Sequence, residues 1–294
     1  MNTRPSNFLG LEPRYTDYKS ARFAVLSAPY EATTTYRGGA RHGPKAILDA
    51  SEQVELFDEE LGDEFHRCGI HTLEPLAPDQ SGPAAMQEVI YRAARRVVRN
   101  GKFLLSLGGE HGITPALVRA VAGRHRKLSV LQIDAHADLR DSFENTPWSH
   151  ASAMRRTLDH VKTVVPVGIR NLSKPERDFM RRAGIEAITA RQCYESDDWV
   201  DRVLNRLGPD VYVTIDIDGF DPAYAPGTGT PEPGGLDWYQ VTGLLRLVAA
   251  EKRIVAADIV EVAPIPGQVV TEFLAARLAY KLVGYVQAAE HGQL

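Results

Sequence analysis

Short segments rich in Val, Ile and Leu alternate with longer segments of helical periodicity along most of this chain. This alternation is typical of a mainly parallel sheet that helices cover on both faces. We therefore predict an α/β fold with three layers, an α/β/α sandwich around a central sheet. The expected strands lie at roughly residues 22–27, 69–73, 103–107, 128–134, 162–168, 185–189, 211–217 and 254–260.

Helical periodicity is clearest in residues 83–100, where apolar side chains recur every three or four positions. Pro83 suits a first helical turn, and Asn100 with Gly101 suits a helix end. Further helices are expected after Pro44, over 237–250, and from about Thr271, where Phe273, Leu274 and Leu278 form an apolar stripe and Arg277 and Lys281 supply exposed charge. Because neither a Ser/Pro/Gly-rich linker nor an internal repeat divides the sequence, we predict a single domain over 1–294.

The composition of the 294 residues limits the partners that this protein can have. With 44% hydrophobic residues, the chain can bury a sizeable core. Its 34 Lys and Arg residues do not exceed the 38 Asp and Glu residues, and this argues against binding to nucleic acid. The longest apolar runs are far shorter than the roughly 20 residues of a membrane span. The opening MNTRPSNFLG does not resemble a signal peptide, and Cys68 and Cys193 fit reduced thiols, so we expect a cytoplasmic protein.

Residue types that bind metals follow three of the expected strands. The strings GGEHG, DAHAD and DIDGFD end or follow the strands at 103–107, 128–134 and 211–217. The carboxyl ends of parallel strands meet at one edge of a sheet, and residues two apart on an extended chain point to the same side. The sequence therefore predicts that six metal-ligand side chains converge: His111, Asp134, His136, Asp138, Asp216 and Asp218.

The charge of this cluster indicates what it binds. One acidic residue at a strand end commonly marks only the return of the chain to water. Four carboxylates together would raise one another's pKa values unless cations offset the repulsion, and four negative charges balance two divalent ions. Carboxylates with one imidazole per ion favour Mn²⁺ over Ni²⁺, Co²⁺ or Fe²⁺. Such ions can lower the pKa of a shared water, so the predicted reaction is metal-assisted hydrolysis.

Several strings, in this order along the chain, resemble the arginase/agmatinase family of ureohydrolases. They are GGEHGIT at 108–114, DAHAD at 134–138, IDIDGFDPAYAPGTGTPEPGG at 215–235 and DIVEVAP at 258–264, and ATTTYRGGARHGPKAI near the amino end is also similar. The resemblance implies an eight-stranded, mainly parallel α/β sandwich that usually assembles as a homo-oligomer, a trimer or hexamer. It also implies two Mn²⁺ ions per chain and a guanidino substrate.

The resemblance also implies roles for particular residues. One Mn²⁺ would bind His111, Asp134, Asp138 and Asp216, and the other would bind His136, Asp134, Asp216 and Asp218. Glu261 would hold the substrate guanidinium through charge-assisted hydrogen bonds. His150 would carry a proton to the departing amine, since a histidine can relay protons at neutral pH. Glu110 and Gly112 replace the Asp and Ser usual in the family's GGDHS string, and we expect them to tune metal affinity.

The identity of the substrate stays open at this point. The segment after DAHAD reads LRDSFENTPWS. It has Arg140 at a position where the arginase pattern resembles Asn. The resemblance therefore favours an arginase activity less. The chain is more similar to agmatinases, which convert agmatine to putrescine and urea in polyamine biosynthesis. N1-aminopropylagmatine and guanidinobutyrate are the alternative substrates. Two hypotheses outside this class are a mononuclear zinc amide deacetylase of related fold and a non-catalytic metal-binding scaffold.

Overall fold

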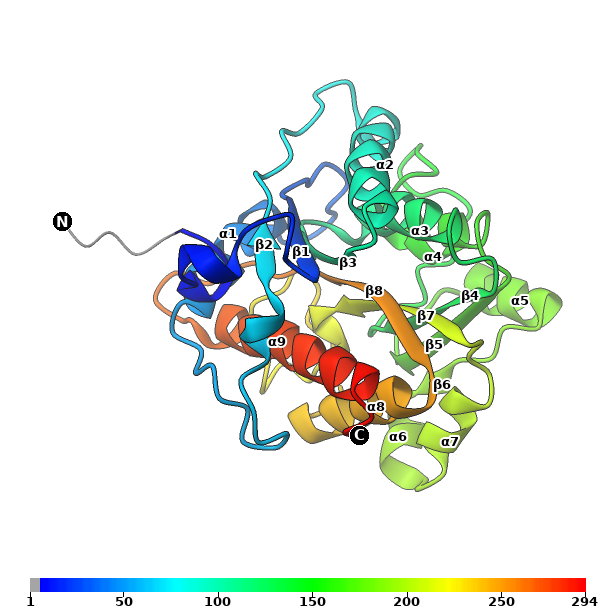
Figure 1. The fold of residues 1–294 in the computed structure, drawn as a ribbon. Coiled ribbons are helices and arrows are strands. Elements are labelled where there is room, and N and C mark those ends of the chain that lie inside the picture. The colour runs from blue at the N-terminus through cyan, green and yellow to red at the C-terminus, as the bar shows by residue number, and fades with distance from the viewer. Residues whose placement is uncertain (1–5) are drawn as a thin grey trace.

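The computed structural model describes residues 6–294 and contains an eight-stranded sheet with the order β2-β1-β3-β8-β7-β4-β5-β6 (Figure 1). Every pair of neighbouring strands is parallel, which confirms the predicted sheet. Residues 1–5 lie outside the described residues. They are the first half of the opening segment that we predict not to be a signal peptide. The strands are β1 Phe23–Ala28, β2 Ile70–Thr72, β3 Phe103–Gly108, β4 Leu128–Ile133, β5 Thr163–Ile169, β6 Ile188–Thr189, β7 Asp210–Asp216 and β8 Arg253–Val260.

The expected strand at 185–189 is the one whose extent differs most from the structure. The other seven agree with their predicted ranges to within one residue at each end, whereas β6 pairs with β5 only from Ile188 onward. The register of this pairing shifts between Val167 and Ile169. β6 lies at the sheet edge, and the helix before it ends at Gly184. Residues 185–187 therefore lead from the helix to the sheet without pairing with β5.

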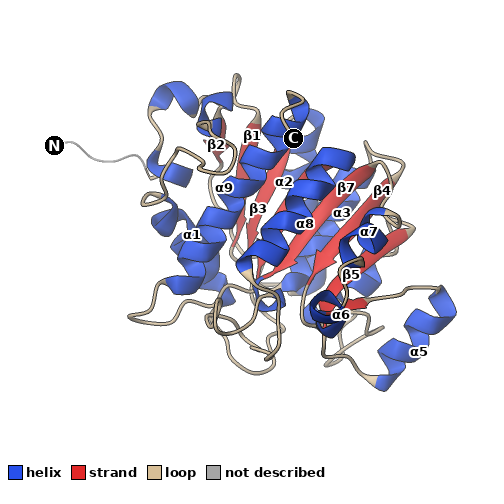
Figure 2. Ribbon diagram, turned by 90° about the horizontal axis from the view of Figure 1, so that it is seen from below, coloured by secondary structure: helices blue, strands red, loops and turns tan. Residues whose placement is uncertain are grey.

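Helices cover both faces of the sheet, which confirms the three-layer α/β/α architecture (Figure 2). All side chains of β1, β3, β4 and β7 are buried, as expected for parallel strands packed between two helical layers. One hydrophobic cluster packs the sheet against α1, α8 and α9, and a second packs the opposite face against α2 and α3. None of the described helices is long and apolar enough to cross a membrane.

The four predicted helices are all present. Pro83 occupies the first turn of α2, and Asn100 caps its end. Asp237 and Gln240 form a capping box at the start of α8. The helices are α1 Gly43–Ser51, α2 Pro83–Arg99, α3 Thr114–Ala122, α4 Ala153–Thr157, α5 Lys174–Ala183, α6 Ala190–Glu195, α7 Trp199–Leu204, α8 Trp238–Glu251 and α9 Val270–Glu290.

The predicted exposure of Lys281 on the last helix is wrong. This lysine is only 2% exposed, and its Nζ donates to Asp58 Oδ1 at 2.8 Å and to Glu60 Oε2 at 3.0 Å. Conversely, Phe273 of the predicted apolar stripe is 40% exposed. The helix is apolar on most sides because it packs against both α1 and α8, so the sequence did not indicate a single exposed face.

The strand order places the chemistry-bearing segments together. Strands β3, β8, β7 and β4 are neighbours in the middle of the sheet. Since all of them run in the same direction, the segments that follow Gly108, Ile133, Asp216 and Val260 leave the sheet at one edge. In sheets of this kind, ligands bind outside the carboxyl ends of the strands.

Candidate metal centre and active site

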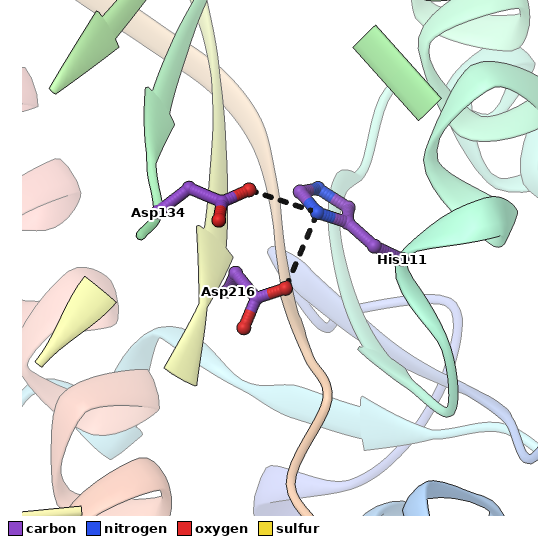
Figure 3. Close-up of side chains that lie close together, drawn as sticks. All are labelled: His111, Asp134 and Asp216. Atoms are coloured by element: carbon purple, nitrogen blue, oxygen red, sulfur yellow. Dashed lines mark ion pairs between the residues drawn. The ribbon is translucent and has the colours of Figure 1, made fainter. Parts of the chain in front are cut away.

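The six side chains predicted as metal ligands lie close together at the carboxyl edge of the sheet. His111 is the centre of the first group (Figure 3). Its Nδ1 lies 3.2 Å from Asp134 Oδ2, 3.0 Å from Asp138 Oδ2 and 3.4 Å from Asp216 Oδ2. All four residues are buried. The donor atoms of His111, Asp134 and Asp216 are close enough together to hold one metal ion.

A second group of donors adjoins the first. His136 Nδ1 lies 3.0 Å from Asp218 Oδ2 and 3.7 Å from Asp134 Oδ1. Together, the donor atoms of Asp134, His136 and Asp218 could hold another ion, so Asp134 belongs to both groups. Two overlapping groups suit two neighbouring ions. A bridging role for Asp216 and a ligand role for Asp138 stay predictions.

Local hydrogen bonds turn each motif toward the site as it leaves its strand. Asp134 Oδ1 accepts the backbone N–H of His136 at 2.6 Å, and Asp216 Oδ1 accepts that of Asp218 at 3.0 Å. In both motifs a carboxylate therefore bonds to the chain two residues later, which is the usual behaviour of Asp in turns. These bonds bring the second ligand of each motif beside the first.

Two site residues have backbone conformations that side chains rarely adopt. Asp138 has φ 53° and Glu261 has φ 62°, both in the left-handed region. Conformations of this kind cost of order 1–3 kcal/mol and persist where surrounding contacts hold them. The carbonyl of Asp138 accepts N–H groups from Met154 and Arg155, and the N–H of Glu261 donates to the carbonyl of Gly109 at 2.8 Å. The fold therefore holds both carboxylates in the site at a cost in backbone energy.

The electrostatics of the cluster favour a bound cation. Burial, together with the charge of Asp138, raises the pKa of Asp134 to about 7. Burial and the neighbouring carboxylates of Asp218 and Asp134 raise the pKa of Asp216 well above its usual value. Burial alone would lower the pKa of His111, but the carboxylates around its Nδ1 raise it strongly. The predicted mutual repulsion is thus present at Asp134 and Asp216.

The donor set also fits a divalent metal in its chemistry. His111 Nδ1 is buried and has no hydrogen-bond partner among the described residues, although three carboxylate oxygens surround it. A metal ion would use the nitrogen lone pair and compensate the carboxylates together. Oxygen-rich sites with one imidazole suit the harder first-row ions. The residues present therefore fit the two metal ions that the sequence predicts.

These pKa values predict how pH affects the metal-free protein. The folded-state pKa values of about 7 for Asp134, mainly from burial, and about 8 for Glu261, also mainly from burial, exceed the unfolded values of 3.8 and 4.5. Each group therefore contributes stability that is complete below its unfolded pKa and is lost as pH rises through its folded pKa. We expect the Tm of the metal-free protein to fall between about pH 5 and pH 8.

Calorimetry in the presence of a chelator measures this dependence, and Mn²⁺ provides the control. Metal binding requires deprotonated ligands, so the stabilisation by added Mn²⁺ is expected to increase over the same pH range. A metal-free Tm that rises from pH 5 to pH 8 would contradict the electrostatic account of the cluster.

Glu261 and His150 line the same cavity as members of both His/Asp groups. The cavity has a volume of ≈ 190 Å³, and Asp138, Asp216 and Asp218 contribute to its lining. Glu261 is buried, and its Oε1 accepts the backbone N–H of His111 at 2.6 Å. His150 Nδ1 lies 3.1 Å from Thr33 Oγ1, which also accepts the His150 backbone N–H at 3.0 Å. Burial lowers the pKa of His150.

Gln132 also shapes the site and was missed in the sequence, and Glu110, which the sequence singled out, makes contacts that the sequence did not indicate. Gln132 Nε2 donates to Asp134 Oδ2 at 2.8 Å and to the carbonyl of His136 at 3.0 Å. Glu110 Oε2 accepts the backbone N–H groups of Ala32 and Thr33, so it holds the loop that positions His150. A polar side chain inside a largely apolar strand, as Gln132 is in β4, is the sequence signal that could have indicated such a residue.

The fold and the site together define an α/β protein with two His/Asp groups that could hold metal ions, and comparisons with known proteins identify its family. The model of the arginase family matches residues 21–284. The N(1)-aminopropylagmatine ureohydrolase of Synechocystis sp. is 43% identical over 288 residues, which are 96% of this chain and 94% of the relative. The agmatinase of Bacillus anthracis is 32% identical over 85% of this chain and 87% of its own length.

A solved structure agrees with the sequence comparisons. The agmatine ureohydrolase of Thermoplasma volcanium superimposes with a TM-score of 0.89 at 27% identity, covering 100% of this chain and 98% of the other. The chain belongs to the arginase family, as the resemblance predicted.

Proposed function

We propose that this protein is a Mn²⁺-dependent ureohydrolase that splits urea from the guanidino group of an agmatine-type cation. The observation that carries the proposal is the pair of overlapping His/Asp groups, members of which line one cavity together with Glu261 and His150. A cavity with this lining combines sites for two cations, a buried carboxylate and a proton carrier. These are the parts that hydrolysis of a guanidinium requires.

N1-aminopropylagmatine is the substrate that we place first, and agmatine second. The sequence alone favoured agmatine. Four relatives that carry the name N(1)-aminopropylagmatine ureohydrolase are 34–43% identical to this chain, and three curated agmatinases are 31–33% identical. Guanidinobutyrate and arginine follow, and Arg140, at a position where the arginase pattern resembles Asn, places arginine last.

The residues of the cavity have separate tasks in this reaction. Bound at the two His/Asp groups, Mn²⁺ ions would lower the pKa of a shared water and supply a nucleophile near neutral pH. Glu261 holds the planar guanidinium through charge-assisted hydrogen bonds, and the N–H of His111 fixes its carboxylate. His150, whose Nδ1 contacts Thr33 Oγ1, donates the proton that the departing amine needs.

Urea release from a panel of guanidino compounds tests the proposal. We expect kcat/KM with Mn²⁺ to decrease in the order N1-aminopropylagmatine, agmatine, guanidinobutyrate, arginine, and to be lower with Ni²⁺. If no compound of the panel releases urea while metal is bound, the proposal is wrong. One zinc per chain with turnover of an acetylated amine would instead indicate a deacetylase, and tight metal binding without turnover would indicate a scaffold.

The remaining expectations belong to the same proposal. We propose that residues 1–294 form one domain, that the chain assembles as a homo-trimer or homo-hexamer, and that it works in the cytoplasm on a substrate of polyamine biosynthesis. Sedimentation of the purified protein at several concentrations measures the assembly, and a monomer throughout would contradict it.

A further inference from the structure

Asp258 is a carboxylate in the middle of the sheet, and neither metal group contains it. The residue lies on β8, is fully buried, and has Thr214 of β7 as its direct neighbour in the register. Thr214 Oγ1 donates to Asp258 Oδ1 at 2.6 Å, Thr114 Oγ1 donates to Oδ2 at 3.0 Å, and the Tyr212 hydroxyl also donates to Oδ2. Burying a carboxylate costs several kcal/mol unless hydrogen bonds compensate it, and these three donors provide that compensation. A buried carboxylate with three dedicated donors suggests a role beyond packing.

Thr214 connects this carboxylate to the metal centre. Its Oγ1 lies 2.9 Å from His111 Nε2, on the side of the imidazole opposite the Asp cluster. A threonine hydroxyl has one proton, and Thr214 gives it to Asp258, so its oxygen must accept from His111. Nε2 of His111 therefore carries the ring proton. In the neutral imidazole, the lone pair is then on Nδ1, the atom that faces Asp134, Asp138 and Asp216.

We propose that Asp258 is a positioning residue that acts through Thr214 to keep His111 ready to bind a metal ion. The chain of contacts fixes the tautomer of His111, orients its ring and makes Nδ1 a better donor. Carboxylates have this effect on ligating histidines in other metal sites. The proposal rests on the proposed metal centre, because it concerns the affinity of the group that contains His111.

A purely structural role for Asp258 makes a different prediction. Thr114 begins α3, and its hydroxyl donates to the same carboxylate, whereas its hydrogen bond to the His111 carbonyl comes from the backbone N–H, which a valine retains. If Asp258 only links strands and α3, loss of the Thr114 hydroxyl should matter as much as loss of the Thr214 hydroxyl. If it acts on the metal, only the Thr214 hydroxyl should change metal affinity.

Mn²⁺ titration of the metal-free protein, followed by electron paramagnetic resonance and calorimetry, separates these roles. Thr214→Val is expected to weaken one of the two Mn²⁺ sites by about 10–100-fold, the range for lost partners of metal ligands. The other site should stay close to wild type. Thr114→Val is the matched control and should leave both sites unchanged, and Thr214→Ser, which retains the hydroxyl, should restore binding.

Each outcome of this titration decides something. Equal Mn²⁺ affinity in wild type and Thr214→Val, or equal weakening by Thr214→Val and Thr114→Val, would overturn the relay and leave the metal centre standing. A wild-type protein that binds no Mn²⁺ would overturn the metal centre and the relay together. Tm values of the metal-free variants report whether each is folded, and Asp258→Asn provides a second variant, for which the same selective weakening is expected.

Discussion

Replacing Asp134 by Asn is expected to lower kcat/KM for the guanidino substrate by at least about 10³-fold. Among the described residues, Asp134 belongs to both His/Asp groups that could hold a metal ion, so its loss affects both. The metal contribution to hydrolysis amounts to several kcal/mol, and each 1.36 kcal/mol corresponds to about a factor of ten in rate. Urea release at saturating Mn²⁺, together with the number of ions bound per chain, measures the effect.

The stability of the same variant provides an independent measurement. Burial and Asp138 raise the pKa of Asp134 to about 7, so its charged form is disfavoured in the metal-free protein. We therefore expect metal-free Asp134→Asn to be no less stable than wild type at pH 8, although it is inactive. Asp178→Asn is the matched control, because Asp178 pairs with Arg181 at 3.3 Å on the surface, where ion pairs contribute little. Activity of Asp134→Asn within tenfold of wild type would contradict the assignment.

Much of the fold could be predicted because parallel strands have a strong local signature. Strands buried on both faces are continuous apolar runs, and seven of the eight were located almost to the residue. The edge strand β6 was the exception, since residues 185–187, which we predicted as part of it, do not pair with β5. The order of the strands has no local signature, because it depends on which helices cross to which side of the sheet. The sequence therefore predicts eight parallel strands but not their order in the sheet.

The candidate site could be predicted where its residues end or follow strands and not where they lie in the middle of them. The ligand types in DAHAD and DID end or directly follow buried strands, which reveals both their position and their direction. Thr214 and Asp258 lie within β7 and β8, and their contact depends on the register between strands far apart in the chain. The left-handed backbone of Glu261 likewise occurs where its N–H donates to the carbonyl of Gly109, a contact that the local sequence does not indicate.

Replacing Lys281 by Met is expected to lower the free energy of unfolding by about 3–5 kcal/mol, the usual cost of removing one partner of a buried ion pair. The lysine on α9 is buried with Asp58, which is 1% exposed, and it also bonds to Glu60. Burial alone would lower the pKa of Lys281, but Asp58 and Glu60 raise it, so the side chain stays charged. A methionine would fill the space and leave the Asp58 carboxylate without its cation.

Lys45→Met is the matched control for this prediction. Lys45 forms a close ion pair with Asp49 at 2.6 Å, but its side chain is 80% exposed, so its loss is expected to cost less than about 1 kcal/mol. Denaturant unfolding of both variants compares the same substitution at a buried and an exposed pair. Neither lysine lines the candidate site, so kcat of each folded variant should equal that of wild type. Equal stability losses in the two variants would mean that burial does not set the strength of the Lys281 pair. In that case, other contacts would hold the segment around Asp58 to α9, such as the hydrogen bond that the Tyr285 hydroxyl donates to Glu60 Oε2 at 2.7 Å.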